Sequence, residues 1–98
     1  MIEIWLRQSV QGHLHPLMQK AQGKVAKLYH AKGRALYISS RADGEHQPGS
    51  FHYNMCAEDY LDGMKHVSKK EIKNKLGPDF DIVEYSWGYH VEYDPKGV

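Results

Sequence analysis

The sequence predicts an α+β fold, in which helices pack on a small and mostly antiparallel sheet. Three observations lead to this expectation. Apolar side chains recur at helical spacing in one long stretch, and a capping box opens a second, shorter helix. Several other stretches are rich in strand-forming residues, and the last two are close enough along the chain to form an antiparallel hairpin.

The stretch 14–32 is the clearest helix, because its apolar residues follow the i, i+3, i+4, i+7 spacing of one helix face. Pro16 suits the first helical turn, and Gly33 suits the residue just past the end. Ahead of this helix, residues 2–6 largely alternate between apolar and polar side chains, which predicts a short edge strand.

Residues Ser68 and Glu71 open the second helix. The serine side chain can accept a hydrogen bond from the third backbone N–H, and the glutamate can reach back to the serine N–H. A short helix is therefore expected from about 69 to 76, and Gly77-Pro78 should end it.

Four stretches are predicted as further strands. They cover residues 35–40, about 55–60, about 80–86 and 89–93. The last two should form a hairpin that turns around Trp87-Gly88.

Length and composition indicate one domain, covering residues 1–98. The hydrophobic content of 41% and the charged content of 26% are typical of a folded globular chain. We expect no membrane span, because no apolar run approaches the required length of roughly 18 residues. We also expect no signal peptide, and hence a protein that is cytoplasmic as synthesised.

The charge balance argues against a nucleic-acid partner. The 13 basic residues face 12 acidic ones, and the lysine cluster at 65–75 includes acidic neighbours, so it is interpreted as a solvated helix face. The single cysteine, Cys56, excludes an internal disulfide and a multi-cysteine zinc site. The one excess is histidine, with seven residues.

Two of these histidines and one aspartate suggest a metal site. His52 and Asp59 lie seven positions apart where a loop enters a strand, and His90 lies in the final hairpin. Two imidazoles and one carboxylate leave a fourth position open for water, which is typical of a catalytic zinc. The alternative is a histidine hydrogen-bonded to a carboxylate, together with an ordinary strand histidine.

The wider pattern is similar to a known family. Ser50-x-His52-x-x-x-x-Ala57-x-Asp59 resembles the S-x-H-x-x-G-x-A-x-D signature of the D-alanyl-D-alanine carboxypeptidase and hedgehog-type zinc peptidase superfamily. The closing segment His90-Val91-Glu92-Tyr93-Asp94-Pro95 is similar to the terminal zinc-histidine strand of small phage-type members. The resemblance extends over roughly residues 14–95 and implies the fold of that superfamily.

The resemblance implies a zinc peptidase that hydrolyses a peptide bond of bacterial peptidoglycan, of the D-Ala-D-Ala carboxypeptidase or the L-Ala-D-Glu endopeptidase type. His52, Asp59 and His90 match the zinc ligands. Glu84 matches the general base that activates the zinc-bound water, with Glu92 as the rival for this role. Arg41 is the candidate for polarising the substrate carbonyl.

Two positions depart from the family pattern. Met55 replaces the signature glycine, and Gly88 stands where relatives often carry a second histidine. These departures leave open an alternative, a non-catalytic zinc-containing binding or structural module with the same fold.

Overall fold

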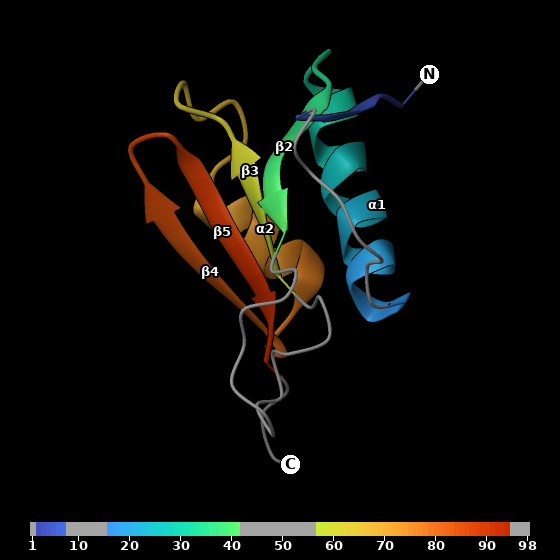
Figure 1. Ribbon diagram of the computed structural model, residues 1–98, viewed down its shortest axis with the longest axis vertical. Helices are drawn as coiled ribbons and strands as arrows, with labels where there is room; N and C mark the ends of the chain where they lie inside the picture. Colours follow the sequence, from blue (N-terminus) through green and yellow to red (C-terminus); the bar gives the residue numbers. More distant parts are fainter. Residues whose placement is uncertain (1, 8–15, 42–56, 95–98) are drawn as a thin grey trace.

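The computed structural model of the chain describes residues 2–7, 16–41 and 57–94, with the backbone alone for Arg41. Within them the chain forms two helices and one five-stranded sheet (Figure 1). In chain order the elements are β1 (Ile4–Leu6), α1 (Pro16–Ala31), β2 (Leu36–Arg41), β3 (Ala57–Leu61), α2 (Lys69–Leu76), β4 (Phe80–Tyr85) and β5 (Gly88–Tyr93).

The strands follow the order β1-β2-β3-β5-β4 across the sheet. β1 runs parallel to β2, and the three other pairings are antiparallel. The predicted α+β class with a mostly antiparallel sheet is therefore confirmed. The strand expected near the start of the chain does lie at an edge, and Ile4, Trp5 and Leu6 in it are all exposed.

One face of the sheet carries the hydrophobic core, and α2 lies behind this sheet in the view of Figure 1. Helix α1 contributes the stripe of buried residues that its periodicity predicts, among them Met18, Val25 and Tyr29. Alternate residues of the central strands meet this stripe, because successive side chains of a strand point to opposite faces. The fully buried side chains on the core face of the three central strands are the hydrophobic Leu36, Ile38, Tyr60, Tyr89 and Val91, together with Glu58. No helix in the described ranges is long and apolar enough to cross a membrane.

The helix ends follow the local sequence. Pro16 is the first residue of α1, and Gly33, with φ of 73°, lies just beyond its last turn. At the start of α2 the Ser68 side chain accepts from the Glu71 N–H, and the Glu71 carboxylate accepts from the Ser68 N–H, both at 3.1 Å. The predicted capping box and the predicted bounds of the second helix are therefore confirmed.

The β4–β5 turn differs from the prediction by one residue. The turn consists of Ser86 and Trp87, and Gly88 already belongs to β5, where it pairs with Tyr85. Gly88 has φ of 150°, and a Cβ atom built on it would lie 1.9 Å from the carbonyl oxygen of Tyr60. The close approach of two backbones therefore requires glycine at this position.

Asp62 fixes the segment that follows β3. Its carboxylate accepts hydrogen bonds from the Tyr29 hydroxyl at 2.7 Å and from the backbone N–H groups of His66 and Val67 at 2.9 and 3.1 Å. Burial alone would raise the pKa of Asp62, but these donors, led by His66, hold it below the ordinary aspartate value. The ionised carboxylate thus ties α1 to the connection between β3 and α2.

Candidate metal centre

Three neighbouring strands place one polar side chain each in a row across the face of the sheet opposite the core. Neither described helix packs on this face, which is called the open face. The register pairs Ser40 of β2 with Asp59 of β3, and Asp59 with His90 of β5. Tyr60 and Tyr89, which flank this row along their strands, are buried on the core side. Strand alternation therefore turns Asp59 and His90 to the face opposite the core.

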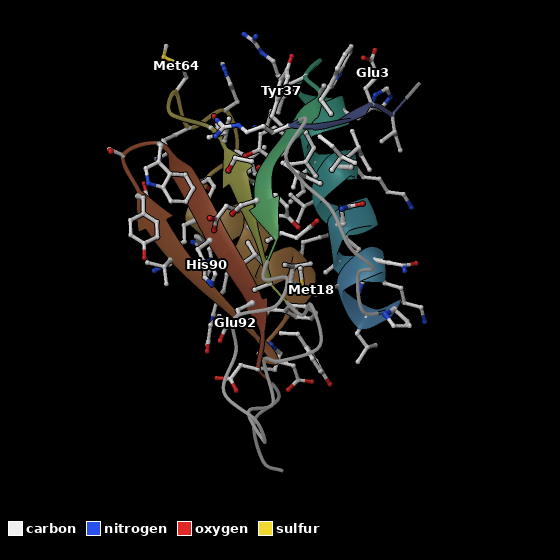
Figure 2. The ribbon with its side chains drawn as sticks, in the orientation of Figure 1. Glu3, Met18, Tyr37, Met64, His90 and Glu92 are labelled. Carbon is white, nitrogen blue, oxygen red and sulfur yellow. The ribbon has the colours of Figure 1, made fainter. Side chains whose placement is uncertain are left out.

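The row is joined by short hydrogen bonds. Figure 2 labels His90, its member from β5, and Glu92 further along the same strand. The Nδ1 atom of His90 lies 2.7 Å from Oδ1 of Asp59, and the Ser40 hydroxyl donates to Oδ2 of the same carboxylate at 2.7 Å. On its other side, Nε2 of His90 lies 3.1 Å from Oε1 of Glu92, two residues further along β5. Both ring nitrogens of His90 therefore face a carboxylate.

These contacts shift both ionisable groups toward their charged forms. The hydrogen bond with Asp59 raises the pKa of His90 to about 8, against the opposing effect of burial and with further help from Glu92. Burial acts to raise the pKa of Asp59, but His90 and Ser40 outweigh it and hold that pKa below its usual value. Without a metal ion, the pair is thus an ion pair near neutral pH.

The pair also fits two ligands of a divalent metal ion. A carboxylate oxygen and an imidazole nitrogen are donors that zinc accepts, and here they face each other. Their remaining polar atoms are already held, Oδ2 by Ser40 and Nε2 by Glu92. An acceptor on the far nitrogen of a ligating histidine fixes the ring and the tautomer, and carboxylates commonly have this role.

The other predicted site residues are placed differently. His52 lies outside the described residues, and of Arg41 only the backbone, paired with Glu58, is described. Glu84 pairs with Tyr89, so its side chain is on the core side of the sheet, opposite to His90. In the described ranges no three His, Cys, Asp or Glu side chains converge as a group able to hold a metal ion.

Sequence reasoning missed Ser40 and gave Glu92 a different role. Ser40 belongs to no recognisable motif, and only the β2–β3 register brings it to Asp59. Glu92 had a detectable signal, since residues two apart on a strand share a face. From the sequence, Glu92 was only the rival to Glu84 as the base, and in the structure it is the hydrogen-bond partner of His90.

A shallow cavity of about 370 Å³ adjoins this row on the open face. It extends from the residue after β1, across β2 and β3, to the β4–β5 turn. Its lining residues are Arg7, Ser39, Ser40, Asp59, Leu61 and Trp87. Asp59 is thus accessible to a ligand from this side.

Comparison with known proteins gives no match, either to a family model, to a curated protein or to a solved structure. The resemblance to zinc peptidases therefore stays a prediction from the sequence motif alone.

Proposed function

We propose that this chain is a zinc-dependent peptidase of the D-alanyl-D-alanine carboxypeptidase and hedgehog-type fold, acting on peptide bonds of bacterial peptidoglycan. In this proposal His52, Asp59 and His90 hold the metal ion. The observation that supports it most strongly is the 2.7 Å approach of Asp59 and His90, two of these three residues, on the open face of the sheet. These two residues are 31 positions apart in the sequence, and they lie on the neighbouring strands β3 and β5.

The order of elements adds support. The resemblance implies a long helix, a strand, a histidine loop, an aspartate strand, a second helix and a final hairpin. The described elements α1, β2, β3, α2 and β4–β5 follow this order, with Asp59 on β3 and His90 on β5. The cavity beside Asp59 offers space for a peptide next to the proposed metal ligands.

A zinc ion bound there would lower the pKa of a bound water toward about 7 and polarise the scissile carbonyl. The chain itself contributes orientation. Ser40 donates to Asp59 and fixes the rotation of its carboxylate, while Glu92 accepts from Nε2 of His90 and leaves Nδ1 directed at Asp59. Glu92 is thus a positioning residue, and its carboxylate increases the basicity of the ring.

A peptidase needs a general base that accepts a proton from the zinc-bound water, and the position of this base distinguishes the peptidase from a second candidate function. The resemblance assigns that role to Glu84, whose register partner Tyr89 is on the opposite face from His90. This placement favours a non-catalytic zinc-containing module with the same fold as the second candidate function. Under that reading, Asp59 and His90 still bind the metal ion, but no hydrolysis follows.

Hydrolysis of purified muropeptides by the zinc-loaded protein tests the proposal. We expect new amino termini to be released by the wild type, and the release to stop after chelation and resume when zinc is restored. His90→Ala should be inactive, whereas His30→Ala, a change of an exposed histidine on α1, should retain full activity. Stoichiometric zinc with no hydrolysis of any muropeptide would instead establish the non-catalytic module.

A further inference from the structure

The cavity beside Asp59 is lined by a positively charged side chain, Arg7, which has no role in the proposed metal site. Arg7, at the end of β1, lines this cavity together with Asp59, and its side chain is exposed. Its backbone N–H donates to the carbonyl of Ile38 and thereby fixes the residue beside β2. Within the described ranges the guanidinium has no hydrogen bond or ion pair.

No hydrogen bond or ion pair joins Asp59 to this guanidinium. Both of its carboxylate oxygens have partners already, Oδ1 with His90 and Oδ2 with Ser40. The cavity therefore presents a positive group with free hydrogen-bond donors. A planar guanidinium pairs best with a carboxylate, to which it can donate two parallel hydrogen bonds.

The remaining walls of the cavity are partly apolar. Leu61 and Trp87 line it, and each is 37% exposed. Trp87 stacks on Tyr85 with ring centroids 4.9 Å apart and an angle of 6° between the ring planes, which holds the indole in place. A cation together with apolar walls suits a small group that combines a carboxylate with a short aliphatic side chain.

We infer that Arg7 binds the carboxylate of the substrate residue that follows the cleaved bond, and that Leu61 and Trp87 contact the side chain of this residue. The inference depends on the proposed function, because it takes the cleaved bond to lie beside Asp59. It makes Arg7 a specificity residue of the site and predicts a preference for an ionised leaving residue over its amide.

A matched pair of peptides tests this inference. The probe is an acetylated tripeptide that ends in D-alanyl-D-alanine, prepared as the free acid and as the amide. The wild type should cleave the acid with a kcat/KM roughly 10–100-fold higher, the usual range for a hydrogen bond to a charged group. Arg7→Gln should remove most of this preference through KM, and Arg7→Lys should retain part of it.

Arg34→Gln is the control, because Arg34 lines other cavities and not this one. It should leave the preference unchanged. A second measurement does not need activity: the indole N–H resonance of Trp87, observed in a Trp5→Phe background, should shift when the free acid is added. The shift should be absent with the amide and in Arg7→Gln.

The two readouts separate this inference from the proposed function. Equal cleavage of acid and amide by the wild type would overturn the role of Arg7 and leave the peptidase intact. If nothing is cleaved, a Trp87 shift that depends on Arg7 would support the carboxylate site while the peptidase proposal fails. No shift with the acid, or an equal shift in Arg7→Gln, would overturn the inference.

Discussion

Gly88 lies so close to Tyr60 that a Cβ atom on it would come within 1.9 Å of the Tyr60 carbonyl oxygen. The same atom would lie 2.7 Å from the backbone nitrogen of Asp62. Any side chain at this position would have to displace backbone. This contact explains why a second histidine, common in the proposed relatives, has no room here two residues before His90.

Gly88→Ala should therefore destabilise the protein by about 2–5 kcal/mol, since it combines backbone overlap with a φ of 150°. Gly23→Ala is the matched control. A Cβ atom at Gly23 meets nothing within 4 Å, and alanine in a helix interior should add roughly 0.5–1 kcal/mol. Urea denaturation of both variants measures the two effects, and similar stabilities would contradict the close approach of β5 to β3.

Tyr29→Phe tests the ionised state of Asp62. At pH 7 the loss of the hydroxyl should cost about 1–3 kcal/mol, because the hydrogen bond goes to a charged and buried carboxylate. The folded pKa of Asp62 is lowered, so its stabilising effect is present above the unfolded pKa of about 3.9. The stabilisation by ionised Asp62 is lost as the pH falls through the pKa that Asp62 has in the folded protein.

The stability difference between wild type and Tyr29→Phe should accordingly shrink in acid, which denaturation at a series of pH values will measure. Tyr37→Phe is the control, since Tyr37 is 50% exposed and its hydroxyl is not among the groups that donate to Asp62. A difference for Tyr29→Phe that does not change with pH would show that Asp62 is not held as the anion.

Much of the fold was predictable because its signals are local. The capping box of Ser68 and Glu71 gave the bounds of the second helix, and helical periodicity gave the buried face of α1. The strand positions were right to within a few residues where the structure describes them. The parallel pairing of β1 with β2 was not predictable, because it joins segments about 32 residues apart without a local signal.

The candidate site was predictable only in part. Asp59 and His90 were identified from the motif, and the register brings them together. The side of the sheet on which Glu84 lies depends on the length of the hairpin turn. With the two-residue turn Ser86–Trp87, Glu84 pairs with Tyr89 and not with His90, so it shares the core face with Tyr89. A turn one residue longer would pair Glu84 with His90 and place both on the same face. Spacing along the sequence cannot distinguish these two turn lengths.

The roles of Glu92 and Glu84 can be distinguished by the effect of substituting each residue on zinc affinity. Glu92→Gln weakens the acceptor on Nε2 of His90, so zinc affinity should fall roughly 10–100-fold. Glu84→Gln should leave it unchanged, because its side chain lies on the other face. Competition with a chromophoric chelator gives both values. Equal affinities, or a larger loss in Glu84→Gln, would contradict the positioning role of Glu92.

The central claim is that Asp59 and His90 hold a zinc ion together. Elemental analysis of the purified protein tests it most directly, with Asp59→Asn and His90→Gln as the diagnostic variants and His30→Gln as the control. We expect about one zinc per chain in the wild type and in His30→Gln, and little or none in the two site variants. A wild type without bound zinc, or full occupancy in both site variants, would contradict it.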